Sequence, residues 1–239
     1  MALPKITSPI YTTKLISTGK EIRFRPFTVK EEKLFLMASE SEDLNSSVDT
    51  IKQVLNNCIL DDIDVDALPV FDIENLFLNL RARSVGEVVK LKYRCNNVVN
   101  DSVCGNTVGI DLNVLEIEPT HYPDHNKKIE LTDNLGIVMK YPSLSLLKDF
   151  NFKDEVESII KITTSCIDYI YDADNIYYSK DSSQSELTEF VESLQSSDLE
   201  KIKKFFDTMP KMVKQLNFKC SKCGHEDNIT VEGIQNFFG

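Results

Sequence analysis

The sequence contains few histidines and few glycines, two residue types on which many active sites depend. There are 3 histidines and 8 glycines among 239 residues, and no tryptophan. So little glycine leaves little material for loops that wrap closely around a phosphate, because such loops need backbone conformations that other residues avoid. The motifs of serine hydrolases, P-loop proteins, zinc metalloproteases and dinucleotide-binding domains are also missing. We therefore expect a protein that is not an enzyme and that takes no small-molecule substrate.

Long apolar runs are missing as well. No stretch approaches the roughly 20 apolar residues that a membrane-spanning helix needs. The first residues, MALPKITSPIYTT, lack the apolar core of a secretion signal. We expect the protein to remain in the cytosol, where cysteines stay reduced. Its 6 cysteines are then better suited to metal binding or burial than to disulfides.

Positive charge is in the minority. With 27 Lys and Arg against 38 Asp and Glu, the formal net charge is −11 and the isoelectric point is about 4.8. Such a chain is repelled by nucleic-acid phosphates and by anionic membranes unless a local basic patch overrides the net field. The basic run KIKK at 201–204 is short and flanked by acidic residues. We expect neither a nucleic acid nor a membrane among its partners.

Local sequence patterns predict an α+β fold with antiparallel strands. In the first part of the chain they predict a strand hairpin and three helices. The strands cover 10–16 and 21–26, and the helices cover 28–40, 47–58 and 72–84. Thr28 is expected to cap the first helix, with Glu31 as its capping-box partner.

The rest of the chain is predicted to alternate between strands and helices. Strands are expected on both sides of the stretch 95–104, followed by a hairpin that turns at 133–134, helices at 144–171, 185–195 and 197–208, and strands at 213–219 and 227–232. The last helix is expected to begin at a capping box formed by Ser197 and Glu200.

Alternating acidic residues between the second and third predicted helices raise the question of a calcium site. Asp62, Asp64 and Asp66 match the first three ligand positions of an EF-hand loop. Ala67 and Ile73, however, stand where that loop needs a glycine and a bidentate glutamate. A solvated acidic connection is the better interpretation.

Two segments far apart in the sequence repeat one pattern around a pair of cysteines. LKYRC at 91–95 resembles LNFKC at 216–220, and CGNTVGIDL at 104–112 resembles CGHEDNITV at 223–231. Each copy predicts a strand, a cysteine turn, a second cysteine, a glycine and a strand. The repetition makes the short C-x-x-C motif of the second copy much more specific than it is alone.

Cys95, Cys104, Cys220 and Cys223 are therefore predicted to hold one structural Zn²⁺ in a split zinc-ribbon-like unit. Zinc prefers four soft ligands in a tetrahedron, and two turns that supply two thiolates each are a common way to build a closed site. The glycine after each second cysteine permits a positive φ, which brings backbone N–H groups toward sulfur. Three nearby cations are expected to offset part of the thiolate charge: Arg94, Lys219 and Lys222.

Other interpretations of the cysteines and histidines remain open. The four thiols could be buried on a sheet, or the second pair could be a redox site, although no helix pattern follows it. His225 could replace one cysteine as a ligand. Cys58 and Cys166 lie on apolar helical stripes and are expected to be core residues. The spacing of the other two histidines would suit a metal on a helix, but a proline between them argues against a helix, and no third ligand is apparent: His121, Pro123 and His125.

A ribbon built from two distant segments must contain an insertion. We expect an N-terminal hairpin and helical segment at 1–84, a split ribbon formed by 85–118 with 211–239, and an inserted hairpin and helices at 119–210. The metal would then tie together distant parts of the chain, where closing the long loop is costly.

Three stretches of the sequence resemble a known family. RFRPFTVKEEKLFLMA at 23–38, the two Cys-Gly turns and the closing VEGIQNFF at 231–238 are similar to baseplate hub subunits and hub assembly proteins of T-even-type contractile-tailed bacteriophages. The resemblance spans nearly the whole chain. It implies a non-enzymatic role in building the baseplate hub, with other hub and tail-tip proteins as partners. It also implies a location in the tail baseplate of the virion, or in the host cytoplasm during assembly.

Two other functions stay open on the sequence alone. A nucleic-acid-binding zinc ribbon would require a basic face on the folded ribbon. An enzyme of unrecognised type would require a concave pocket with converging titratable groups. The aromatic end of the chain, Phe237 and Phe238, is expected either to dock on its own domain or to insert into a partner.

Overall fold

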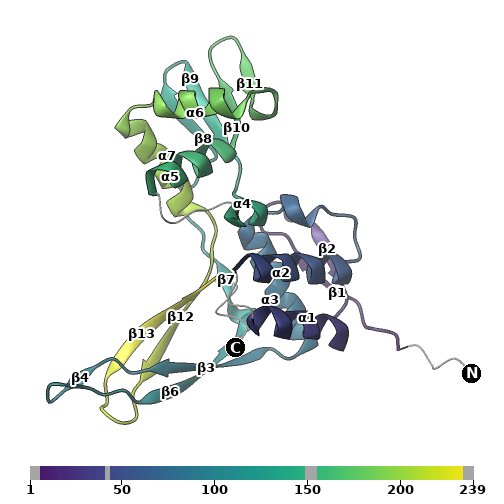
Figure 1. Cartoon of the computed structure of the whole chain (residues 1–239), viewed down its shortest axis with the longest axis vertical. Helices are drawn as coiled ribbons and strands as arrows, with labels where there is room; N and C mark the ends of the chain where they lie inside the picture. The colour runs from purple at the N-terminus through teal and green to yellow at the C-terminus, as the bar shows by residue number, and fades with distance from the viewer. Residues whose placement is uncertain (1–5, 41–43, 149–154, 234–239) are drawn as a thin grey trace, which may run out of the picture. The chain divides into compact units, whose positions relative to one another are not determined.

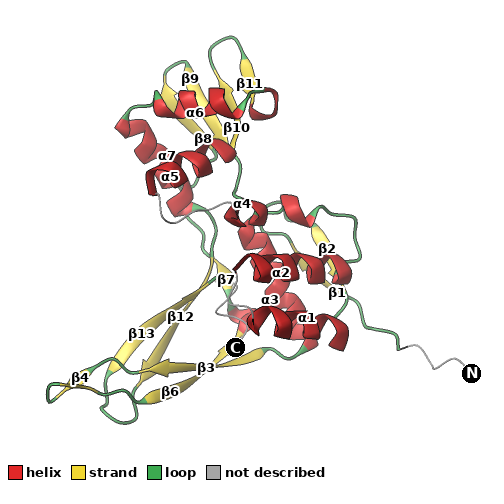
Figure 2. Ribbon diagram, in the orientation of Figure 1, coloured by secondary structure: helices red, strands yellow, loops and turns green. Residues whose placement is uncertain are grey.

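The computed structural model describes residues 6–40, 44–148 and 155–233. Within them the fold is α+β, with antiparallel sheets and seven α-helices (Figure 2). This confirms the predicted fold class at that level. The chain divides into two compact units. The first joins the residues up to 65 with 71–120 and with those from 211 onward, and the second joins 66–70 with 121–210.

The first unit begins with a strand hairpin and helices that closely follow the predicted elements. They are β1 (Tyr11–Lys14), β2 (Glu21–Phe24), α1 (Val29–Glu40), α2 (Leu44–Cys58) and α3 (Val70–Ser84) (Figure 1). β1 and β2 pair antiparallel. β2 and α2 each turn one face inward, whereas α3 is buried on most of its sides. Fully buried side chains come from all three elements: Ile22, Ile51, Leu55, Phe77 and Leu80.

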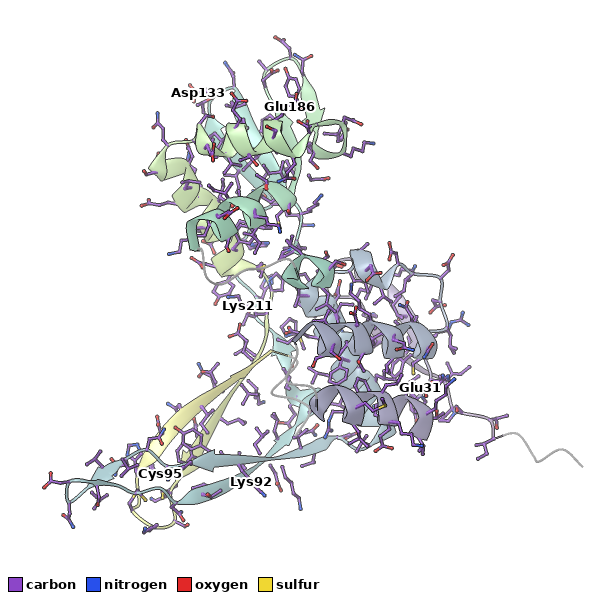
Figure 3. The ribbon with its side chains drawn as sticks, viewed as in Figure 1. Glu31, Lys92, Cys95, Asp133, Glu186 and Lys211 are labelled. Carbon is purple, nitrogen blue, oxygen red and sulfur yellow. The ribbon has the colours of Figure 1, made fainter. Side chains whose placement is uncertain are left out.

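The start of α1 is anchored by a buried carboxylate. Glu31 Oε2 accepts the backbone N–H of Thr28 at 2.8 Å, as a capping-box residue does. Its other oxygen accepts a hydrogen bond from Arg25 Nη2 at 3.0 Å. Burial acts to raise the pKa of Glu31, but the hydrogen bonds from Arg25 and Thr28 outweigh it and hold the pKa at about 2. Glu31 (labelled in Figure 3) therefore stays charged at neutral pH.

Two long antiparallel hairpins form the rest of the first unit. β3 (Val88–Arg94) pairs with β6 (Thr107–Asn113), and β12 (Met212–Lys219) pairs with β13 (Glu226–Glu232). In Figure 1 the two hairpins come together at the end near β4, and Phe218 packs against Tyr93 with ring centroids 4.6 Å apart. The strands predicted around the cysteine turns are thus present, within one residue of the predicted bounds for the second hairpin.

Two short elements in this region were not predicted. A small hairpin, β4 (Val98–Val99) with β5 (Ser102–Val103), occupies the loop between Cys95 and Cys104. It turns at Asn100 and Asp101, which both have positive φ, as a two-residue hairpin turn requires.

The second short element is β7 (Glu118–Pro119), which pairs with β12 where the chain leaves the first unit and returns to it. The backbone N–H of Thr120 donates to the carbonyl of Lys211 at 2.9 Å, and the N–H of Lys211 donates to Thr120 Oγ1 at 3.0 Å. Lys211 is labelled in Figure 3. The residues from 121 to 210 therefore begin and end at one hydrogen-bonded position of the first unit.

The second unit is a four-stranded antiparallel sheet covered by helices. Its elements are β8 (Lys128–Thr132), β9 (Leu135–Met139), α4 (Leu144–Lys148), α5 (Glu155–Ser165), β10 (Ile167–Tyr171), β11 (Ile176–Tyr178), α6 (Gln184–Glu192) and α7 (Ser196–Thr208). The strand order is β11-β10-β9-β8. Side chains of α6 and α7, including Val191, Ile202 and Phe205, are buried in one core with Ile129 and Ile137 of the strands.

The prediction of a helix over 144–171 was wrong at its end. Ile167–Tyr171 is strand β10, which pairs with β9 on one side and β11 on the other. Its residues are β-branched or aromatic except for Asp168, and so short a run fits a helical stripe and a buried strand equally well. The segment forms a strand and not a helix because it pairs with two neighbouring strands, and local sequence does not encode that pairing.

The predicted cap of the last helix was also wrong. α7 begins at Ser196 after Gln195, which makes no side-chain capping bond. A capping box occurs instead at α6, where Ser183 Oγ accepts the N–H of Glu186 at 3.3 Å and Glu186 Oε2 accepts the N–H of Ser183 at 2.8 Å.

Candidate metal centre

The structure brings the four predicted cysteines together at one end of the paired hairpins. Cys95 (labelled in Figure 3) follows β3, Cys104 precedes β6, and Cys220 and Cys223 lie in the turn between β12 and β13. Their four sulfur atoms lie within 4.8 Å of one another. Residues 95–106 are called the first knuckle below, and residues 220–225 the second knuckle.

The distances between sulfurs fit a metal site better than disulfides. Cys95 Sγ lies 3.7 Å from Cys223 Sγ, and Cys104 Sγ lies 3.8 Å from Cys220 Sγ. Sulfurs at the corners of a tetrahedron with zinc–sulfur bonds of about 2.3 Å are about 3.8 Å apart. A disulfide would need about 2.05 Å, and all four cysteines are free thiols. The cluster could therefore hold one metal ion.

The two knuckles have the same backbone hydrogen bonds despite their different lengths. In the first, Cys95 N–H donates to the Asn106 carbonyl at 2.8 Å, and Gly105 N–H donates back to the Cys95 carbonyl at 3.0 Å. In the second, Cys220 N–H donates to His225 at 2.8 Å, and Gly224 N–H donates back to Cys220 at 2.9 Å. The φ angles are 63° at Gly105 and 74° at Gly224, which side chains avoid. The sequence repeat thus corresponds to a repeated structure.

The sulfurs of the second knuckle are held by N–H donors that favour thiolates. The backbone N–H of Cys223, the side-chain amide of Asn106 and the N–H of Lys222 lower the pKa of Cys220 to about 6, although burial opposes them. The backbone N–H of His225 and the side-chain amide of Asn97 lower the pKa of Cys223 against the same opposition. This half of the cluster supplies the charged form that binds metal.

The sulfurs of the first knuckle favour the protonated thiol. The backbone N–H of Asn97 acts to lower the pKa of Cys95, but burial and the hydrogen bonds shared with the other thiols outweigh it and raise the pKa to about 12. At Cys104 the N–H of Asn106 is outweighed in the same way, so its pKa is also raised. Four thiolates this close together repel one another, so the four sulfurs cannot all be charged unless a cation lies among them. A bound divalent ion removes this repulsion.

Apolar side chains surround the cluster. Cys95 and Cys220 are almost fully buried, together with Phe218. Half-buried side chains of the two hairpins pack around them: Tyr93, Cys104, Val108, Ile110, Cys223 and Ile229. This packing shields the sulfurs from water on the side of the strands.

Of the three predicted cations, two lie against the knuckles. Lys222 Nζ donates to the carbonyl of Cys104 at 3.3 Å, which joins the second knuckle to the first. The Arg94 guanidinium lies beside Gly105, where an added Cβ would be 3.6 Å from Nη2. Lys219 is instead paired with Glu226, at 2.8 Å.

The remaining cysteines and His225 take no part in the cluster. Cys58 and Cys166 are buried elsewhere, and burial raises their pKa values to about 11 and about 12. His225 contributes its backbone to the second knuckle, while its ring Nε2 lies 3.9 Å from Asp227. The four cysteines are the one group of metal-ligating side chains found among the described residues, and Asp62, Asp64 and Asp66 form none.

The His125 side chain hydrogen-bonds to two residues of the second unit. Its Nδ1 lies 2.9 Å from Thr208 Oγ1 and its Nε2 lies 3.0 Å from the Tyr141 hydroxyl. Because the Thr208 hydroxyl donates to the Lys204 carbonyl at 2.7 Å, it accepts from Nδ1–H, and Nε2 accepts from Tyr141. This is the neutral ring, and burial lowers its pKa accordingly. His121 is exposed and joins no such cluster in the described structure.

Sequence reasoning missed Asn97 and Asn106. Each lies two residues after a cysteine of the first knuckle, and each side-chain amide approaches a sulfur of the second knuckle. The signal that could have found them is the same donor side chain at the same place after both cysteines, since hydrogen-bond donors next to metal ligands commonly orient those ligands.

Phe237 and Phe238 lie outside the described residues, so the two expectations for them stay predictions. Across the described part of the chain, every helix is too short or too polar to cross a membrane.

Comparison with known proteins gave one match. A family model described as T4 bacteriophage base plate protein matches residues 8–239. No match was found among curated proteins or among solved structures. The match covers the strand hairpins, both knuckles and the whole second unit.

Proposed function

Since the chain belongs to the family of T4 bacteriophage base plate proteins, we propose that it is a non-enzymatic component of the baseplate hub, acting in its structure or its assembly. Membership in the family indicates a structural component of the phage tail, located in the virion and in contact with other tail proteins. The finer assignment to the hub, with other hub and tail-tip proteins as partners, rests on the sequence resemblance at 23–38, at the knuckles and at 231–238. Assembly in the host cytoplasm belongs to the same proposal.

The cluster of four thiols is the observation on which the proposed mechanism rests. We propose that Cys95, Cys104, Cys220 and Cys223 bind one structural Zn²⁺ and that the two hairpins form a split zinc ribbon. A closed site of four thiolates is the usual structural zinc site, and soft sulfur ligands select against Mg²⁺ and Ca²⁺. Bound zinc would fix the knuckles and leave no open position for a substrate.

The zinc would act as a clip between distant segments. Cys104 and Cys220 are 116 residues apart in sequence, and Cys95 and Cys223 are 128 apart. Linking such distant segments removes much of the freedom of the unfolded chain, so the ion stabilises the fold by closing a long loop. We propose the same division as the sequence predicted: an N-terminal part at 1–84, the split ribbon at 85–118 and 211–239, and an inserted part at 119–210.

The hub assignment is tested by locating the chain among its neighbours. We would add an affinity tag at the N-terminus, purify assembly intermediates and finished tails from infected cells, and identify cross-linked residues by mass spectrometry. We expect cross-links to the central baseplate proteins and to the tail tip, with zinc present in the purified chain. Cross-links confined to the peripheral baseplate proteins would contradict the hub assignment.

One observation favours a second candidate, nucleic-acid binding. Lys90, Lys92 and Arg94 are all exposed on one face of β3, which gives the ribbon a basic stripe. Lys90 lies opposite Asp111 in the strand register, however, and the chain as a whole carries a net charge of −11. We expect no salt-sensitive binding to DNA or RNA in a mobility-shift assay at physiological ionic strength. Binding that is lost in a Lys90→Glu, Lys92→Glu double variant would favour this candidate.

A further inference from the structure

We propose that Asn97 and Asn106 fasten the two knuckles to each other around the metal ion and so slow its release. Each places its backbone on one knuckle and its side-chain amide on a sulfur of the other. The inference rests on the proposed structural metal site and adds to it the residues that position the sulfurs.

Asn97 contacts three of the four cysteines. Its backbone N–H donates to Cys95 Sγ, and its carbonyl accepts the N–H of Cys104 at 2.8 Å. Its side-chain Nδ2 lies 3.7 Å from Cys223 Sγ, across the cluster in the second knuckle. One residue therefore holds the two cysteines of the first knuckle in register and reaches the opposite sulfur.

Asn106 repeats the arrangement at the other end of the first knuckle. Its backbone N–H donates to Cys104 Sγ, and its carbonyl accepts the N–H of Cys95 at 2.8 Å. Its side-chain Nδ2 lies 3.4 Å from Cys220 Sγ and 3.2 Å from Ser221 Oγ. The second knuckle is thus contacted by a first-knuckle amide at each of its two sulfurs.

The chemistry of the amide suits this place. A metal-bound thiolate has no proton, so it can only accept hydrogen bonds, and the amide NH₂ is a neutral donor that adds no charge to the site. His225 occupies the position in the second knuckle that Asn106 occupies in the first, yet its ring lies by Asp227. Among the described residues, the two amide contacts to sulfur both run from the first knuckle to the second. In the other direction, Lys222 of the second knuckle donates to the carbonyl of Cys104 and not to a sulfur.

Removing either amide leaves one sulfur of the second knuckle with one donor fewer and removes one of the contacts between the two knuckles. Loss of such outer contacts commonly weakens metal binding by about 10-fold to 100-fold. The amides hold the sulfurs around the bound ion, so we expect their loss to be measured most directly in the rate of metal release.

The test measures zinc release from the full-length protein to a chromogenic chelator. The variants are Asn97→Ala, Asn106→Ala and the double variant, together with Asn97→Asp and Asn106→Asp, which keep the size of the side chain and place a repelling oxygen near sulfur. We expect each alanine variant to release zinc at least about 10-fold faster than the unaltered protein. We expect each aspartate variant to release it faster still. The Asn106 amide donates to Ser221 Oγ. In Asn106→Asp the carboxylate can instead accept from the Ser221 hydroxyl, so this variant keeps a contact with Ser221 if alanine disturbs the fold.

Two control variants separate the sulfur contacts from general effects. Ser221→Ala removes the other partner of Asn106 and leaves the amide on Cys220. Asn217→Ala removes an exposed amide of β12 that has no sulfur contact. Both are expected to release zinc at the unaltered rate. Zinc release unchanged in the asparagine variants, or accelerated equally in the controls, would overturn the inference while leaving the metal site intact. Full-length protein that binds no zinc at all would overturn the proposed site and this inference with it.

Discussion

The paired hairpins of the first unit and the sheet of the second unit are both antiparallel, but they are stabilised by different means. Among the described residues, the second unit has a core of nine buried residues, with eight further apolar residues packed against it. Around the knuckles, the buried residues of the described chain are Cys95, Phe218 and Cys220. Two of these three are proposed metal ligands.

The comparison shows what a metal ion contributes to a small core. An apolar cluster as small as the one around the knuckles contributes little stability by itself, and small structures of this kind commonly need a metal or a disulfide. The second unit covers its sheet with α6 and α7 and has no such need. We therefore expect the hairpins to depend on the ion and the second unit to be independent of it.

The largest expected effect comes from removing one sulfur. In Cys220→Ser the site keeps three sulfurs, and we expect it to lose its metal and the hairpins to lose their protection, because metal binding and folding are coupled there. Metal content by native mass spectrometry and hydrogen exchange of β3 and β12 measure both effects. Cys166→Ala, in the buried core of the second unit, is the matched control and should keep its metal. Full metal content in Cys220→Ser would refute the claim that the hairpins depend on a metal ion bound by four sulfurs.

A substitution in the core of the second unit should lower the stability of that unit and leave the metal site unchanged. Phe205 is almost fully buried and its ring centroid lies 5.2 Å from that of His125. Phe205→Ala should cost about 3–5 kcal/mol of unfolding free energy by opening a cavity, with metal content unchanged. Urea denaturation and zinc analysis provide the two readouts. Phe206→Ala, at a half-buried neighbour, should cost less, and metal loss in Phe205→Ala would show that the two regions are not independent.

A smaller effect distinguishes two glycines, one in each region. A Cβ added at Gly136 of β9 would lie 2.7 Å from the carbonyl oxygen of Ile129 and would clash with the hydroxyl of Tyr171. Gly136→Ala should therefore cost about 1–3 kcal/mol through overpacking. Gly109 of β6 has no atom within 4 Å of that position, so Gly109→Ala should change stability by less than about 0.5 kcal/mol. Equal losses in thermal denaturation of both variants would contradict this difference.

The smallest expected effect concerns the helix caps of the second unit. Ser183→Ala removes the capping box of α6 and should cost about 1 kcal/mol. Ser197→Ala lies one residue inside α7 and should cost almost nothing, since Ser197 is not the cap. Metal content should be the same in both. A larger loss of unfolding free energy in Ser197→Ala than in Ser183→Ala would contradict the structure and support the capping box predicted at Ser197 and Glu200.

The elements that local sequence determines were predictable. The hairpin turning at 133–134 and helices α1 to α3 follow from the spacing of their apolar residues, although α2 and α3 begin three and two residues before the predicted starts. The convergence of four cysteines could be predicted because the flanking residues repeat, which implies the same backbone turn twice.

Other features depend on contacts that a single segment does not encode. Strand β10 is fixed by its pairing with β9 and β11, and β7 by its pairing with β12. The roles of Asn97 and Asn106 require the opposite knuckle to be in place, which only the folded chain provides. The capping boxes show the same limit, because both Ser183 and Ser197 have a glutamate three residues later, and only the first is a cap.

The most direct test of the central claim is the coordination of the metal in the intact protein. X-ray absorption at the zinc edge, on full-length protein with its metal content measured, gives the ligand atoms and their distances. The account predicts one zinc per chain, bound by four sulfurs at about 2.3 Å. Protein without zinc, or zinc bound mainly through nitrogen and oxygen, would contradict it.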